Sequence, residues 1–148
     1  MTIRTSIANQ QESMTISREH LREVARTVLE GEDIPDARIS IALVDNPTIH
    51  ALNKRFLEHD EPTDVLSFPL SGPGAKVLEG ELVIGVEVAQ TQARERGHDE
   101  SAELALYVIH GLLHFCGYDD TTTKASIEMR AKERHYLSKL GLPDIAPE

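Results

Sequence analysis

The stretch Val108–Thr121, VIHGLLHFCGYDDT, decides how the rest of this chain is interpreted. Its apolar residues predict a helix, on which His110 and His114, four positions apart, share one face. Gly117 predicts the end of that helix, because glycine readily adopts the left-handed backbone that reverses the chain. The stretch therefore places two imidazoles beside a tight turn that carries two carboxylates.

These side chains have the composition of an open metal site. Two imidazoles spaced in this way can reach one ion, and a carboxylate from Asp119 or Asp120 is an acceptable third ligand for zinc. Three protein ligands leave a fourth position for water, which is a catalytic arrangement. A structural zinc site would need more cysteines than Cys116, the single cysteine of the chain. The alternative, that both histidines are hydrogen-bonded core residues, stays open at this point.

The neighbour of the first histidine argues against a metalloprotease. Such enzymes place a glutamate there as general base, whereas this chain has Gly111. Glycine at that position allows either close approach of a substrate or close packing of the helix. The remaining histidines have no partner at ligand spacing and are expected to be surface or packing residues: His20, His50, His59, His98 and His135.

Length and composition restrict the class of protein. The 148 residues, 40% of them apolar, predict one domain spanning residues 1–148, with an irregular tail after about residue 142. No apolar run approaches the roughly 20 residues that span a bilayer, so no membrane contact is expected. The N-terminus lacks the apolar core of a secretory signal, and the single cysteine favours a reducing cytoplasm.

The net charge of −10 excludes bulk electrostatic attraction to polyanions. A nucleic-acid substrate would need a local basic patch or a metal ion. Basic residues do gather near the C-terminus, but acidic residues alternate with them, so we interpret this segment as a solvated helix face. The bases are Lys124, Arg130, Lys132, Arg134 and Lys139, and the interleaved acids are Glu128 and Glu133.

Hydrophobic periodicity and breaker residues predict an α+β fold, a single compact domain with a roughly four-stranded mixed sheet and about five helices. The last helices follow one another without strands between them, which favours this class. Strands are predicted near Ile3–Ala8, Ile39–Leu43, Asp64–Leu70 and Gly80–Val88. Helices are predicted near Ser17–Gly31, Asn46–Leu57, Val88–Arg96, Asp99–Gly117 and Thr122–Leu140.

The histidine stretch resembles the signature of the YbeY-type endoribonucleases, the rRNA maturation factors, whose pattern is H-G-x-L-H-x-x-G-Y-D-H. Leu52–Leu70, LNKRFLEHDEPTDVLSFPL, is similar to the family's N-x-x-[aromatic]-R-x-x-D-x-P-T-[DN]-V-L-S-F-P. Gly80–Gly85, GELVIG, resembles the family's G-D-I-x-I-S strand, and Glu128–Gly141 resembles its closing M-x-x-x-E…L-x-x-L-G helix. Together these motifs cover about Ile39–Gly141.

The resemblance implies a fold, an activity and partners. The expected fold is a small α+β domain in which three histidines bind zinc at the floor of a cleft. The expected activity is hydrolysis of single-stranded RNA, in maturation of the 3′ end of small-subunit rRNA and in ribosome quality control. The expected partners are single-stranded RNA, small-subunit rRNA and the ribosome, in the bacterial cytoplasm.

The chain departs from the family at the third ligand, because the family's third histidine falls on Asp120. We therefore predict that His110, His114 and Asp120 hold one zinc ion, although this ligand set also accepts other divalent transition metals. The extra negative charge predicts a weaker Lewis acid and a higher pKa for bound water. Asp119, at the family's aspartate position, is interpreted as forming the turn or as supporting a ligand side chain from behind, and not as the ligand itself.

A second departure concerns an arginine that the family places after the aromatic residue, where this chain has Leu57. In the family this arginine lies in the cleft and is thought to hold phosphate. Arg55 does not replace it on a regular helix, since it points about 200° away, at about 100° per residue. Loss of a cationic clamp is expected to cost a few kcal/mol of transition-state stabilisation.

The remaining site residues are predicted less specifically. No residue is assigned as general base, and Asp64, Glu81 and Glu103 are candidates by residue type alone. The cleft wall is predicted to include Thr63, Ser67, Phe68 and Gly111.

Two alternative functions stay open. A non-catalytic ribosome-assembly factor would use the same cleft to bind RNA or a ribosomal protein, and Leu57 favours it. A metal-dependent hydrolase could instead act on a small phosphoester or a peptide, and Gly111 argues against peptides.

Overall fold

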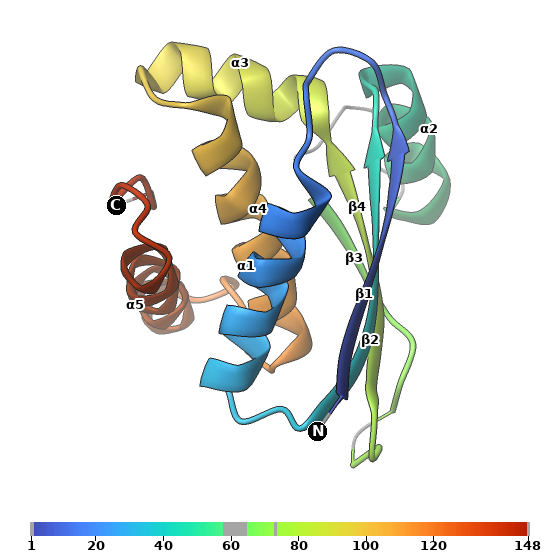
Figure 1. Cartoon of the computed structure of the whole chain (residues 1–148), viewed down its shortest axis with the longest axis vertical. Helices are drawn as coiled ribbons and strands as arrows, with labels where there is room; N and C mark the ends of the chain where they lie inside the picture. Colours follow the sequence, from blue (N-terminus) through green and yellow to red (C-terminus); the bar gives the residue numbers. More distant parts are fainter. Residues whose placement is uncertain (1, 58–64, 73, 148) are drawn as a thin grey trace.

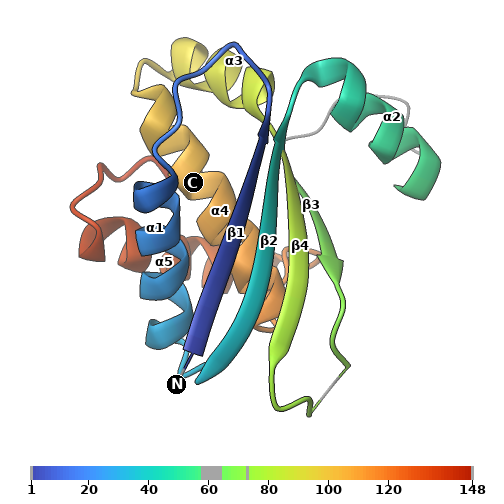
Figure 2. The ribbon, with the colours of Figure 1, turned by 45° about the vertical axis from the view of Figure 1, so that its right-hand side comes forward.

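A four-stranded mixed sheet lies at the centre of the fold. The computed structural model describes residues 2–57, 65–72 and 74–147, with the backbone alone for residues 56 and 57. The strands are β1 (Thr2–Gln10), β2 (Asp36–Val44), β3 (Val65–Pro69) and β4 (Leu78–Gly85). Their order in the sheet is β1-β2-β4-β3, which Figure 2 shows across the ribbon. Strands β1, β2 and β4 are parallel to one another, and β3 pairs antiparallel with β4.

Helices cover both faces of this sheet, but unequally. They are α1 (Arg18–Gly31), α2 (Asn46–Leu57), α3 (Val86–Arg96), α4 (Glu100–Phe115) and α5 (Thr123–Lys139). In Figure 1, α1 and α4 lie against one face, α5 packs outside them, and α2 lies on the other side. Within the described part of the chain, no helix is long and apolar enough to cross a membrane.

The sheet separates two apolar clusters. Side chains alternate between the two faces along each strand, so each strand residue faces one cluster or the other. Leu82 and Ile84 of β4 join the large cluster that also contains the buried residues of α1 and α4. Val83, between them, joins a smaller cluster with Ile49 of α2. Because successive strand side chains point to opposite faces, the position of a residue along β3 or β4 decides whether it faces α4 or α2.

Helix α4 is the central helix of the larger layer. Asp99 caps it by accepting a 2.9 Å hydrogen bond from the backbone N–H of Ser101. Its middle is apolar on all sides, as expected for a helix with neighbours all around it. At Gly111 it packs so closely on β4 that a Cβ atom there would lie 2.6 Å from Leu82 Cδ2. This close contact fixes where the last turns of α4 lie relative to the sheet.

The predicted α+β class, with four strands and five helices, is confirmed for the described residues. The predicted strand ending at Val88 is too long, since β4 stops at Gly85, which pairs with Val44, the last residue of β2. The first strand is longer than predicted, because its backbone pairs with β2 as far as Gln10. Residues 142–147 form neither helix nor strand.

Candidate metal centre

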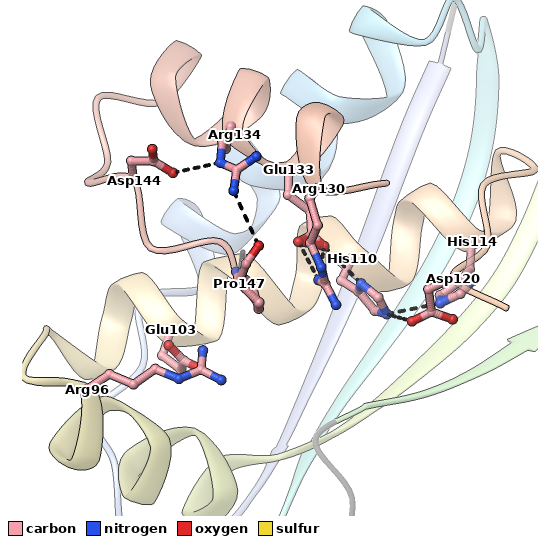
Figure 3. Close-up of polar contacts among 10 residues, drawn as sticks. All are labelled: Arg96, Glu103, His110, His114, Asp120, Arg130, Glu133, Arg134, Asp144 and Pro147. Carbon is pink, nitrogen blue, oxygen red and sulfur yellow. Dashed lines mark hydrogen bonds and ion pairs between the residues drawn. The ribbon is translucent and has the colours of Figure 1, made fainter. Parts of the chain in front are cut away.

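The two histidines of the opening stretch meet at the C-terminal end of α4. Figure 3 shows them side by side, and their Nε2 atoms are 3.0 Å apart. The rings are nearly perpendicular, with centroids separated by 4.6 Å. The prediction that His110 and His114 share one helix face is therefore confirmed.

A glycine turn after α4 brings a carboxylate back to the histidines. The helix ends at Phe115, and Gly117 adopts a φ of +101°, a conformation that glycine reaches without strain. The N–H of Tyr118 donates to the carbonyl of Leu113 and closes the turn. Asp120 Oδ2 then lies 3.9 Å from His110 Nε2. One ligand atom from each of His110, His114 and Asp120 falls within 4.8 Å of the other two.

These three residues, which we call the ligand group, could hold a metal ion. Zinc bonds of about 2.0–2.1 Å in tetrahedral geometry would place ligand atoms about 3.3 Å apart. The 3.0 Å and 3.9 Å separations lie on either side of that value, so small side-chain adjustments suffice. Burial lowers the pKa of His114, and the adjacent His110 lowers it further. His114 is therefore neutral at neutral pH, which is the form that binds metal.

A buried glutamate of α5 orients the first ligand. Glu133 has no exposed side-chain surface, and its Oε2 accepts a 3.0 Å hydrogen bond from His110 Nδ1. Because a carboxylate can only accept, His110 carries a proton on Nδ1 and presents the lone pair of Nε2 to the ligand group. Arg130 Nη1 donates to both oxygens of the same carboxylate, at 2.6 and 2.8 Å, so Glu133 joins the histidine to an arginine of α5.

The Arg130–Glu133 pair was not predicted as part of the site. The interpretation of this segment as a solvated helix face is wrong for Glu133, which is fully buried, and for Arg130, whose side chain is only 22% exposed. Lys132, on the same helix, is 39% exposed and pairs with Glu32 at the end of α1. The available signal was Met129 followed four residues later by Glu133, because positions four apart share one helix face.

A second buried glutamate lies along the same helix. Glu103 accepts hydrogen bonds from Arg96 Nη1, at 3.5 Å, and from His98 Nε2. It lies two turns before His110 on α4, and it lines the same cavity of about 570 Å³. The candidate base Glu103 is thus engaged with α3 and the following loop and is not part of the ligand group.

Two of the predicted site residues have packing or turn roles. Asp119 Oδ1 accepts hydrogen bonds from the backbone N–H and the hydroxyl of Thr121, so it stabilises the turn that carries Asp120. Gly111 of α4 is buried against Leu82 of β4 and is not among the residues that line the cavity beside the ligand group. Of the two roles considered for Gly111, close helix packing is the one observed.

The predicted wall residues on the sheet fall on opposite faces. Ser67 pairs with Leu82, so it faces α4. Phe68 packs in the smaller cluster on the α2 face, which separates it from the ligand group and corrects the prediction. Glu81, a candidate base, is the register partner of Phe68 and shares that face, so it is equally remote from the ligand group.

Some residues named in the sequence analysis lie outside the described part of the chain. They are His59, Thr63, Asp64 and the side chain of Leu57.

Comparison with known proteins shows which family the chain resembles. The family model described as Endoribonuclease YbeY matches residues 6–141. The Endoribonuclease YbeY of Carboxydothermus hydrogenoformans is 39% identical over 140 residues, covering 93% of this chain and 98% of that protein. The corresponding protein of Nautilia profundicola is 43% identical over 111 residues, covering 74% and 77%.

A solved structure supports the same assignment. The solution structure of TM1509 from Thermotoga maritima superposes with a TM-score of 0.68 at 32% identity, covering 94% of this chain and 89% of that one. The Carboxydothermus relative covers 93% of this chain and the solved structure covers 94% of it. This chain therefore belongs to the YbeY family of endoribonucleases.

Proposed function

We propose that this protein is a zinc-dependent endoribonuclease of single-stranded RNA, acting in the cytoplasm on the 3′ end of small-subunit rRNA and in ribosome quality control. The observation that carries the proposal is the ligand group, with His110 oriented by Glu133 inside a cavity. An open three-ligand set is typical of catalytic rather than structural zinc. The names of the family and of the relatives support RNA as the substrate.

Each residue of the site has a defined part in this reaction. A zinc ion held by His110, His114 and Asp120 would supply a water of lowered pKa and a positive charge for a phosphate oxygen. Glu133 holds the ring of His110 in the tautomer and orientation that a ligand needs. Asp119 keeps the turn in the conformation that brings Asp120 to the histidines. No general base is assigned among the described residues.

Metal removal tests the activity directly. Purified protein stripped with a chelator is expected not to cleave a single-stranded fragment of the rRNA 3′ end, and stoichiometric zinc is expected to restore cleavage. The same sequence annealed to its complement is expected to resist cleavage. Gel analysis of end-labelled RNA gives the rates. A zinc-loaded protein that binds the RNA and leaves it intact would instead support the non-catalytic assembly factor.

The aspartate ligand makes a distinct prediction about pH. Asp120→His replaces a carboxylate by a neutral imidazole and so leaves the metal a stronger Lewis acid. The pKa of the attacking water is expected to fall, so the rise of cleavage rate with pH should move to lower pH. Asp119→Asn is the matched control, because it removes the adjacent negative charge from outside the ligand group. An unshifted profile in Asp120→His would contradict the assignment of Asp120 as a ligand.

A further inference from the structure

One arginine faces the cavity beside the ligand group and has donors to spare. Arg130 lies on α5 and lines the cavity of about 570 Å³ together with His110, Asp120 and Glu133. It also lines a second cavity, of about 500 Å³, that runs along the first turns of α5. Asp120 is the other residue that lines both. Arg130 and Asp120 therefore lie where the two cavities meet.

The hydrogen bonds of Arg130 use only part of its guanidinium. A guanidinium has five N–H donors, and here Nη1 alone serves both oxygens of Glu133. Among the described residues, Nε and Nη2 of Arg130 have no partner. Figure 3 shows its guanidinium beside the ring of His110. The side chain is 22% exposed and lines the cavity, so a ligand there can approach the guanidinium.

The other arginines around the two cavities are placed differently. Arg134 is engaged with the C-terminal segment, where it donates to the Pro147 carbonyl and pairs with Asp144. Arg96 pairs with Glu103, about two helical turns from His110 along α4. Arg130 is thus the arginine held next to the ligand group, by a carboxylate that also holds a ligand histidine.

Charge at the site supports a role beyond neutralising Glu133. The carboxylates of Asp120 and Glu133 together would match the two charges of a divalent ion held by the ligand group. The positive charge of Arg130 is then what leaves the site attractive to a phosphodiester. This matters because the chain as a whole has a net charge of −10 and repels RNA at long range.

We propose that Arg130 is a phosphate-binding residue, which contacts a non-bridging oxygen of the RNA strand adjacent to the ligand group. Guanidinium groups suit phosphate because their planar donors bind it in a fixed geometry. A strand passing from one cavity to the other would cross Asp120 and Arg130 at their junction. This assignment rests on the proposed RNA substrate and adds a substrate-binding side chain to it.

The competing role, counter-ion of Glu133 alone, gives different binding behaviour. A side chain that contacts phosphate contributes to the salt dependence of RNA binding, with a slope of about 0.7 per contact for single strands. For Arg130→Gln we expect 10-fold to 100-fold weaker RNA binding and a slope shallower by about 0.7. A pure counter-ion would instead change zinc affinity or thermal stability and leave this slope unchanged.

The test is RNA binding by zinc-loaded protein, measured across a series of salt concentrations. The ligand is a single-stranded 2′-O-methyl RNA, checked by gel for integrity after each titration. Lys132→Gln is the matched control, because it removes the same charge from α5 at a position paired with Glu32. It is expected to keep the wild-type slope. Zinc affinity and melting temperature of every variant establish that the site and the fold survive.

A second measurement identifies direct contact. Methylphosphonate groups, which remove one phosphate charge, are placed at single positions along the RNA. A methylphosphonate at one position is expected to weaken RNA binding by the wild-type protein. The same substitution is expected to leave RNA binding by Arg130→Gln unchanged. Arg130→Gln also leaves the Glu133 carboxylate without its arginine partner. The comparison is therefore repeated between Glu133→Gln and the double variant Glu133→Gln/Arg130→Gln, in both of which that carboxylate is absent.

The outcomes separate the two proposals. Equal slopes and equal methylphosphonate profiles for wild type and Arg130→Gln would overturn the phosphate contact while leaving the nuclease intact. A wild-type protein that binds no single-stranded RNA would overturn the proposed function and, with it, the role of Arg130.

Discussion

Replacing His114 with alanine is expected to reduce RNA cleavage to the level of metal-free protein. His114 supplies one of three ligand atoms that lie within 4.8 Å of one another, so two ligands would remain. Outer partners of metal ligands typically contribute 10–100-fold to affinity, and we expect a direct ligand to contribute more than about 100-fold. The measurements are zinc affinity by competition with a chromogenic chelator and cleavage rate at limiting zinc.

The control for this variant is His135→Ala, which removes an exposed imidazole from α5. It is expected to leave zinc affinity and cleavage at wild-type levels. Adding Asp120→Asn to His114→Ala should lower cleavage no further, since residues that act as one unit are not additive. Cleavage by metal-free His114→Ala at the wild-type, zinc-loaded rate would refute the metal mechanism.

Glu133→Gln is expected to weaken zinc binding by about 10-fold to 100-fold, the usual effect of losing the partner of a ligand histidine. Glutamine preserves the shape of Glu133 but accepts the His110 Nδ1 hydrogen bond without a negative charge. The imidazole then becomes a weaker donor to the metal. Titration of the metal-free variant with zinc gives the affinity directly, and cleavage at saturating zinc should recover most of its rate.

Glu103→Gln is the matched control for this prediction. Both glutamates are fully buried, and each accepts from one histidine and one arginine. Only Glu133 touches the ligand group, so Glu103→Gln is expected to alter stability without altering zinc affinity. Equal losses of zinc affinity in the two variants would show that general destabilisation, and not orientation of His110, is responsible.

The ligand group could be predicted because it is local. His110, His114, Gly117 and Asp120 lie within eleven consecutive residues. Helix periodicity and one glycine turn predict that the histidines meet a carboxylate from Asp119 or Asp120, and the family resemblance selects Asp120. The same locality accounts for the helix bounds, whose caps and stop residues are adjacent in sequence. Strand alternation also predicts that Ser67 and Phe68 point to opposite faces of the sheet. The two residues therefore could not both belong to one cleft wall, and the sequence was sufficient to show this.

The residues that support the ligand group depend on contacts between elements. Glu133 reaches His110 only because α5 packs on α4, and Arg130 joins them through Glu133, three positions away on the same helix. Their sequence context, alternating acids and bases on a helix, is the same as that of a solvated face. Burial separates the two cases, and burial is set by which surface of α5 faces α4.

The α+β class, the helices, the two histidine ligands and a carboxylate from Asp119 or Asp120 follow from spacing within one or two elements, and the family resemblance selects Asp120. Only the tertiary structure decided that Gly111 packs on Leu82, that Phe68 faces α2, and that Arg130 and Glu133 complete the site. These depend on sheet order and helix packing, which join side chains distant in sequence.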